Sequence, residues 1–448
     1  MASTYARITP SSNGNRKTWT FSAWVKRSNT NENDTIFSSG NSTDVEFFLR
    51  INTGNAITVY NSQFGINLTL TTNRLFRDNN AWYHIVFTLD TTQATASDRA
   101  KLYVNGVQET SFLSSTYPSQ NADLVLPQTS TIIDLGRRST GSNQHFNGLM
   151  SHVHFCDGYA YSPTDFGEYD ANGVWTIKTS PSVSYGTWGF FVLKDGNSVT
   201  DQSGNGNDLT VGGTALTNTE DNPSNVFATL NAIEPPATSR TYSNGNLTVE
   251  FPDANVCTSV STLGMSKGKY YFEAKLTAGS SGNPRGIVGI CYNPYIIDSN
   301  GQYIGASIDA GSIGYYAQNG NVLKADTTQY TGSAFDTGDI IGVALDLDNY
   351  YIYFSKNGTW QNSGDPTSGA TGTGGVSTDN PADRSGFYFF GVGDTSGVYG
   401  QTFSVNFGNG YFGTTAVASA GTNASGIGIF EYDVPTGYTA LSTKGLNL

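Results

Sequence analysis

Residues 338–366 read GDIIGVALDLDNYYIYFSKNGTWQNSGDP, and this stretch decides the fold class. Alternate positions from 341 to 347 are apolar and the positions between them are small or acidic, which is the period-two pattern of a half-buried strand. A turn at Asp348-Asn349 leads to a second strand over 350–355, and Asn357-Gly358 marks a further tight turn because both residues tolerate positive φ. The stretch therefore predicts an antiparallel β-meander.

The first third of the chain repeats this pattern. Residues 19–27 (WTFSAWVKR) alternate between two faces, and residues 82–90 (WYHIVFTLD) do the same. Residues 101–108 (KLYVNGVQ) contain a hairpin turn at Asn105-Gly106. In the first of these strands we expect Trp19, Phe21, Ala23 and Val25 to share one face, opposite Thr20, Ser22, Trp24 and Lys26.

Composition agrees with a β-rich protein and excludes some partners. The 448 residues include 52 glycines and only 13% charged residues, with a net charge of −13 and a pI of about 4.6. An acidic surface repels phosphates, so we expect no nucleic acid partner.

The sequence shows no apolar run long enough to span a membrane and no apolar core of a signal peptide, so we expect cytosolic synthesis without membrane insertion. Three cysteines are too few for a disulfide framework, and we expect buried thiols.

Two regions resemble known β-sandwich families. The order WTFSAWVKR, WYHIVFTLD, KLYVNG and FNGLMSHVHFCDG resembles the laminin-G-like, concanavalin-type jelly roll. Residues 268–276 (GKYYFEAKL), 338–366 and 403–409 (FSVNFGN), in this order, resemble a SPRY domain. These resemblances imply an all-β fold of two concanavalin-like antiparallel β-sandwiches (jelly rolls), joined by a turn-rich connector.

Four segments follow from this interpretation. We expect a laminin-G/concanavalin-like sandwich over 1–160, a turn-rich connector packed on the sandwiches over 161–229, a SPRY-like sandwich over 230–415 and a closing segment over 416–448. The connector prediction depends on the dense turn residues after Asp157.

The connector suggests the origin of the chain. Residues 162–175 (SPTDFGEYDANGVW) and 201–211 (DQSGNGNDLTV) resemble the connecting region of virion structural proteins from tailed bacteriophages, especially those that infect marine cyanobacteria. The resemblance implies a tail fibre or appendage of the virion, assembled in the host cytoplasm, whose lectin-like domains contact host surface polysaccharide. Other virion proteins would be its partners, and a homo-oligomer would provide avidity. The alternative is a capsid decoration or tail-assembly protein that binds only other virion proteins.

Candidate ligand-binding residues follow from the SPRY resemblance, because SPRY modules bind through loops at one end of the sandwich. Aromatic residues in polar loops suit stacking on sugars or docking on proteins. The candidates are Tyr315, Tyr316, Trp360 and Tyr399. The alternative for each is that it covers the sheet.

Two patterns resemble metal sites. Asp201, Ser203 and Asn205 place oxygens as a calcium loop does, but Gly212 occupies the position of the bidentate glutamate. A turn is therefore favoured over calcium, and we expect no cofactor. His152, His154 and Cys156 alternate along a strand, but no second His/Cys pair stands nearby to complete a zinc site.

Catalytic motifs are incomplete. No G-x-S-x-G elbow accompanies the four histidines. Glycosidases of concanavalin type commonly use Glu-x-Asp-x-x-Glu, and the pairs Glu168/Asp170 and Glu431/Asp433 begin that pattern. Gly173 and Thr436 stand where the last glutamate is needed. We therefore predict that the protein is not an enzyme, with a glycan depolymerase as the weaker alternative.

Overall fold

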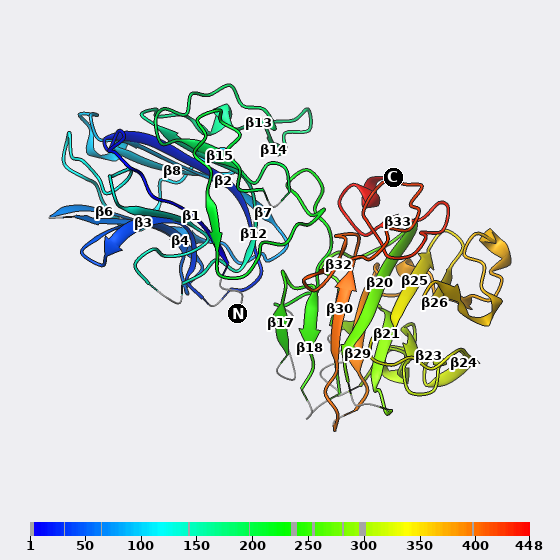
Figure 1. The fold of residues 1–448 in the computed structure, drawn as a ribbon. Helices are drawn as coiled ribbons and strands as arrows, with labels where there is room; N and C mark the ends of the chain where they lie inside the picture. Colours follow the sequence, from blue (N-terminus) through cyan, green and yellow to red (C-terminus); the bar gives the residue numbers. More distant parts are fainter. Residues whose placement is uncertain are drawn as a thin grey trace. The chain divides into compact units, whose positions relative to one another are not determined.

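The computed structural model describes residues 4–30, 32–63, 65–141, 144–196, 198–233, 240–252, 256–279, 282–294, 302–396 and 398–448 (Figure 1). It is nearly all-β, as predicted, and its strands form antiparallel sheets with one short parallel pairing. The chain divides into two compact units, Met1–Asn218 and Thr219–Leu448.

The first unit contains an eight-stranded sheet and a six-stranded sheet. The larger sheet has the order β10 (Phe112–Thr116), β6 (Ile66–Leu75), β5 (Ala56–Gln63), β4 (Val45–Ile51), β3 (Asp34–Ser42), β11 (Ile132–Leu135), β1 (Tyr5–Ile8) and β16 (Thr210–Gly212). The smaller has the order β15 (Phe190–Val192), β12 (Gly148–Asp157), β2 (Thr18–Arg27), β7 (Trp82–Asp90), β8 (Ala100–Val104) and β9 (Val107–Gln108). A separate hairpin pairs β13 (Gly167–Tyr169) with β14 (Trp175–Ile177).

Aromatic side chains fill the core of the first unit. Trp19 packs against Phe47, Phe87 and Phe155, with ring centroids 5.2, 5.3 and 5.8 Å away. The four residues predicted to share one face of β2 are all fully buried. The alternation of the sequence thus grouped the side chains of this face correctly.

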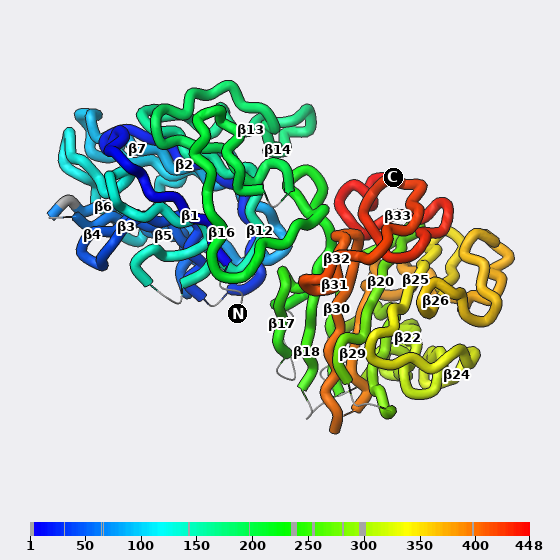
Figure 2. Tube along the Cα trace, in the orientation of Figure 1, coloured from blue at the N-terminus to red at the C-terminus, as the bar shows by residue number. Residues whose placement is uncertain are grey.

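The opposite face of the six-stranded sheet is also buried, which the alternation of β2 did not predict. The hydroxyl of Thr20 donates to the carbonyl of Tyr159 (2.8 Å), and that of Thr88 donates to the carbonyl of Tyr161 (2.7 Å). The segment predicted as a connector thus begins by covering this sheet. It also supplies β15 beside β12 and β16 beside β1. Figure 2 shows β16 in green and β1 in blue.

The second unit also contains two sheets. One has the order β17 (Thr241–Ser243), β18 (Thr248–Glu250), β30 (Thr402–Asn406), β20 (Lys269–Ala278), β25 (Ile340–Asp346), β26 (Tyr351–Lys356) and β27 (Thr359–Trp360), with β28 (Val376–Ser377) on β26 and β33 (Thr439–Ala440) parallel to β20. The other has the order β19 (Cys257–Val260), β29 (Phe389–Asp394), β21 (Gly286–Cys291), β22 (Ile313–Tyr316), β23 (Asn321–Lys324) and β24 (Thr327–Thr331). A further hairpin joins β31 (Tyr411–Phe412) and β32 (Thr415–Ala416).

The meander predicted from 338–366 is confirmed by β25 and β26, with Asn357 and Gly358 both at positive φ. The prediction that β25 is half-buried is wrong, because Ala344 and Asp346 on its second face are fully buried. The closing segment covers this face, because Phe430 and Tyr438 pack in a small second core with Tyr271 and Tyr353. Figure 1 shows the closing segment in red, with its strand β33 beside β20.

Short 3₁₀ turns complete the described structure: η1 (Ala96–Asp98), η2 (Pro163–Asp165), η3 (Ser307–Asp309), η4 (Gln361–Ser363), η5 (Gly369–Thr371), η6 (Pro381–Asp383) and η7 (Gly445–Asn447). Among the described residues, no helix has the length and apolar character needed to cross a membrane. All three cysteines are buried, as predicted.

Candidate functional site

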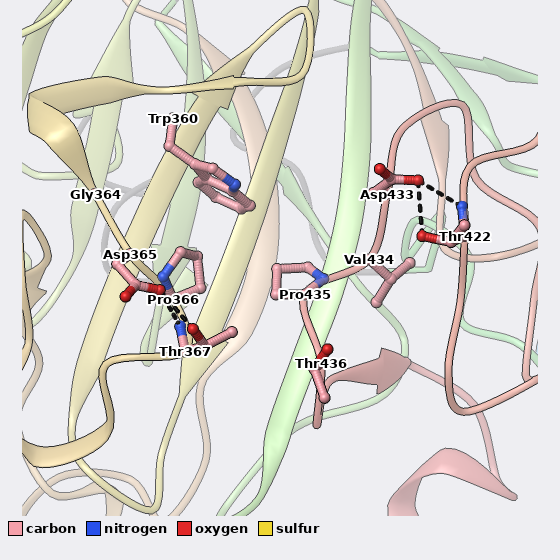
Figure 3. Close-up of a pocket in the computed structure, with 10 residues that line it drawn as sticks. All are labelled: Trp360, Gly364, Asp365, Pro366, Thr367, Thr422, Asp433, Val434, Pro435 and Thr436. Carbon is pink, nitrogen blue, oxygen red and sulfur yellow. Dashed lines mark hydrogen bonds between the residues drawn. The ribbon is translucent and has the colours of Figure 1, made fainter.

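A pocket of about 390 Å³ opens in the second unit, on the face of the nine-stranded sheet that carries the closing segment. One wall comes from the loop after β27 and the other from the closing segment (Figure 3). The lining residues are Trp360, Gly364, Asp365, Pro366, Thr367, Thr422, Asp433, Val434, Pro435 and Thr436. The volume is in the range of small-molecule sites.

Trp360 is held by the β26–β27 hairpin, where it pairs with Ser355. Its ring meets the ring of Tyr271 edge to face, with centroids 6.5 Å apart, and Tyr271 in turn packs on Phe430. The indole is partly exposed. Trp360 is thus fixed at the margin of the second core while part of its ring remains available to a ligand.

Each wall carries one aspartate in the same arrangement. Asp365 Oδ1 accepts hydrogen bonds from the backbone N–H (2.9 Å) and the hydroxyl (2.6 Å) of Thr367. Asp433 Oδ1 accepts from the backbone N–H (2.6 Å) and the hydroxyl (2.8 Å) of Thr422. The hydroxyl of Thr367 lowers the pKa of Asp365, and the N–H of Thr422 lowers the pKa of Asp433. Both side chains are therefore ionised at neutral pH, and the described residues that line the pocket include no basic one.

Two buried contacts hold the walls in place. The hydroxyl of Tyr438 donates to the carbonyl of Pro366 (3.0 Å) and so connects one wall to the other. The carboxylate of Glu273 accepts hydrogen bonds from the backbone N–H groups of Glu431 and Tyr432, both at 2.9 Å. Glu273 thereby anchors the closing segment directly before Asp433.

Family comparisons agree with this architecture. Residues 1–165 match the family model described as the concanavalin A-like lectin/glucanases superfamily, and residues 269–378 match the model of the SPRY domain. The chain therefore carries a concanavalin A-like domain and a SPRY domain. The SPRY match includes the pocket wall at 360–367 but not the wall at 422–436. The pocket thus combines the SPRY domain with a segment beyond it.

Solved structures provide further comparisons. The SPRY domain of human HERC1 is 18% identical, covering 38% of this chain and 92% of its own, with a TM-score of 0.31. A putative carbohydrate binding protein from Bacteroides ovatus is 16% identical, covering 48% and 58%, with a TM-score of 0.31. A SAP-like pentraxin from Limulus polyphemus is 12% identical, covering 36% and 72%, with a TM-score of 0.28. None of the curated proteins compared matches the chain.

The four aromatic candidates in the SPRY domain do not form one site. Tyr315 is fully buried and its hydroxyl donates to the carbonyl of Ser333, so it cannot reach a surface ligand. Tyr316 lies on the outer face of the six-stranded sheet, where its hydroxyl binds Arg285 and Gln318. Tyr399 is 39% exposed and follows β29. Trp360 alone lines the pocket.

Sequence reasoning missed Asp365, Thr367 and Thr422, and it considered Asp433 only as part of a catalytic pattern. A signal was present, because both walls carry aspartate, proline and threonine in close succession: Asp365-Pro366-Thr367 and Asp433-Val434-Pro435-Thr436. Nothing in the sequence indicates that the two segments face one another. Their meeting depends on the folding of the closing segment over the sheet.

The calcium-like loop is a turn in the structure. Asp201 accepts four hydrogen bonds, from the N–H groups of Phe191, Ser203 and Asn207 and from the hydroxyl of Ser203. The side-chain amide of Asn205 donates to the carbonyls of Gly186 and Gly189. These bonds tie the loop to a neighbouring segment. Across the described residues, no group of three or more His, Cys, Asp or Glu side chains is placed to hold a metal.

His152 and His154 do not share one regular strand face. A bulge interrupts the pairing of β12 between Ser151 and His154, and His152 adopts a positive φ of 47°. His154 Nδ1 lies 2.9 Å from the hydroxyl of Tyr185. The alternation that suggested a zinc site is therefore broken.

A serine and a histidine lie close together in the concanavalin A-like domain, with Ser22 Oγ 2.8 Å from His84 Nε2. The indole N–H of Trp175 donates to His84 Nδ1 (3.0 Å), so the proton of the neutral ring is on Nε2 and His84 donates to Ser22. A histidine in this tautomer cannot accept the proton of the serine. Instead, the contact fastens the β13–β14 hairpin to β2 and β7.

The buried His84 predicts acid sensitivity of the first unit. Burial lowers the pKa of His84 to about 3, from 6.5 in its ordinary state. Below the ordinary pKa the unfolded chain therefore binds a proton that the folded chain does not. His84 alone should lower the free energy of unfolding by about 2 kcal/mol between about pH 7 and about pH 5. Burial of His152 and His154 acts in the same direction.

Urea denaturation at the two pH values tests this prediction. His84→Asn provides the control, because an asparagine amide can still accept from an indole N–H and donate to a hydroxyl but does not titrate. The pH dependence should be smaller in this variant. An equal pH dependence of the midpoint in the unsubstituted protein and in His84→Asn would contradict the prediction.

Proposed function

We propose that this protein is a non-enzymatic, glycan-binding structural protein of a bacteriophage virion, in a tail fibre or similar appendage that contacts the host surface. The pocket between Trp360 and the closing segment is the observation that carries the binding function. A partly exposed indole stacks on the apolar face of a sugar ring, while ionised carboxylates and threonine hydroxyls bond its hydroxyl groups. Pocket volume and residue types both suit a saccharide.

Several observations support this proposal. The family model matched by the first 165 residues belongs to a superfamily that includes lectins. The resemblance of 162–175 and 201–211 to phage virion proteins supports the location on the particle, after assembly in the host cytoplasm. A homo-oligomer attached to other virion proteins would multiply weak sugar contacts into firm attachment.

The non-enzymatic part of the proposal draws on the acidic residues considered for glycosidase chemistry. Glu431 Oε2 accepts a hydrogen bond from the backbone N–H of Ala418 (2.6 Å). Asp170 Oδ1 accepts from the backbone N–H groups of Asn172 (2.9 Å) and Val174 (2.8 Å). These side chains stabilise turns, so we assign them no part in hydrolysis.

Two measurements test the proposal, one on intact phage particles and one on the purified protein. Gold-labelled antibody should mark the tail of intact particles, and the purified full-length protein should bind host cells and extracted lipopolysaccharide saturably and in competition with free sugars. Label on the head together with absence of host binding would instead support a capsid decoration or assembly protein. Release of shorter saccharides from the polysaccharide would support a depolymerase.

A further inference from the structure

The two aspartates of the pocket each keep one carboxylate oxygen free. In both, Oδ1 is fixed by a threonine N–H and a threonine hydroxyl. For the described part of the chain, Oδ2 of Asp365 and Oδ2 of Asp433 have no hydrogen bond or ion pair of their own (Figure 3). Both side chains are exposed to solvent, and the fixed oxygen orients each of them, so Oδ2 of each is an available acceptor at the rim of the pocket.

A cationic side chain beside Tyr438 is already paired. The ammonium group of Lys269 lies 5.8 Å from the centre of the Tyr438 ring and 2.9 Å from the carboxylate of Asp346. Asp346 is fully buried, so the ion pair between Lys269 and Asp346 remains intact. The charges of Asp365 and Asp433 are therefore not neutralised by a basic residue in the pocket lining.

Trp360 adds a third attraction for positive charge. The face of an indole ring is the strongest aromatic partner for a cation, and part of this ring is exposed in the pocket. An anionic group would instead face two fixed carboxylates without any cation to balance it. The pocket therefore favours a positively charged sugar over a neutral or a negatively charged one.

We propose that the sugar bound in this pocket carries a free ammonium group, as a 2-amino-2-deoxyhexose does, and that uronic acids and sialic acids are excluded. This inference rests on the proposed glycan-binding function. The ammonium group donates to Oδ2 of Asp365 or Asp433, while the ring carbons stack on Trp360.

Calorimetric titration of the full-length protein with three probes tests the inference at about pH 6, where amino groups are protonated. The probes are a glucosamine oligosaccharide, the N-acetylated oligosaccharide of the same length, and a glucuronate-containing oligosaccharide. The glucosamine probe should bind about tenfold more tightly than the N-acetylated one. This preference should decline with added sodium chloride. The glucuronate probe should bind most weakly.

Asp365→Asn and Asp433→Asn are the informative variants. An asparagine keeps the oxygen that accepts from threonine and replaces the free oxygen with an NH₂ group, so the fold of each wall is preserved. Each variant should reduce the preference for the glucosamine probe and retain binding of the N-acetylated probe. Asp383→Asn removes an exposed carboxylate that does not line the pocket and should change nothing.

The outcomes separate this inference from the proposed function. Equal binding of the glucosamine and N-acetylated probes, or tighter binding of the glucuronate probe, would overturn the ammonium preference and leave a glycan site. Absence of binding for all three probes would overturn both.

Discussion

Glu273→Ala is expected to lower the free energy of unfolding of the second unit by about 3–5 kcal/mol. Glu273 is fully buried, and its carboxylate accepts four hydrogen bonds. The donors are the N–H groups of Glu431 (2.9 Å) and Tyr432 (2.9 Å), the amide of Asn406 (3.2 Å) and the hydroxyl of Tyr271 (3.2 Å). Alanine leaves the N–H groups of Glu431 and Tyr432 without this acceptor where the closing segment meets the sheet, while the amide of Asn406 keeps its hydrogen bond to the carbonyl of Ile429 (3.0 Å).

Urea denaturation measures this loss, and hydrogen exchange of peptides from β20 and the closing segment assigns it to the second unit. Glu250→Ala is the matched control, because Glu250 lies in the same sheet but is exposed, and its loss should cost less than about 0.5 kcal/mol. A Glu273→Ala variant within about 1 kcal/mol of the unsubstituted protein would contradict the expected role of Glu273.

The pH dependence of the second unit provides a signature of the same residue. Burial raises the pKa of Glu273 to about 7, from 4.5 in its ordinary state, despite the hydrogen bonds that oppose this shift. The folded chain therefore binds the proton more tightly than the unfolded chain. The stability that this group contributes is fully present below 4.5 and is lost as the pH rises through about 7. Glu273→Ala should lack this dependence.

Trp360→Ala is expected to weaken glycan binding at least about 30-fold, because a central tryptophan in a pocket commonly contributes 2 kcal/mol or more. The fold should persist, since Trp360 lies at the margin of the second core. Trp360→Phe, which keeps an aromatic face, should retain most of the affinity. Circular dichroism of each variant verifies folding before titration with the glucosamine and N-acetylated oligosaccharides.

Phe387→Ala is the matched control for Trp360. Phe387 is an aromatic side chain of the same unit, 48% exposed, that does not line the pocket. Its removal should leave the affinity unchanged. Equal losses for Trp360→Ala and Phe387→Ala would show that binding does not depend on the pocket.

The sequence predicts local structure well because strand faces follow from alternation along a single segment. Trp19 and Phe21 were placed on one face of a strand, and this face is buried; the β25–β26 meander was placed with its turn at Asn357-Gly358. The burial of Ser22 and Ala344 on the opposite faces was not predicted. Their cover comes from segments distant in the sequence, and no local pattern records it.

The site was predicted only in part for the same reason. Trp360 was identified from the SPRY resemblance, but Asp433, which lines the same pocket, lies 73 positions later and reaches it only through the closing segment. Tyr315 and Tyr316 looked equivalent in sequence, whereas strand alternation places one in the core and the other outside. Asp201 showed that a calcium-like spacing and a hydrogen-bonded turn use the same residues.

The most direct test of the proposed pocket is a crystal structure of the full-length protein with the glucosamine oligosaccharide. The sugar ring should lie on the indole of Trp360, with its ammonium group within hydrogen-bond distance of Asp365 or Asp433. An oligosaccharide bound elsewhere, with the space between Trp360 and Asp433 empty, would contradict this site.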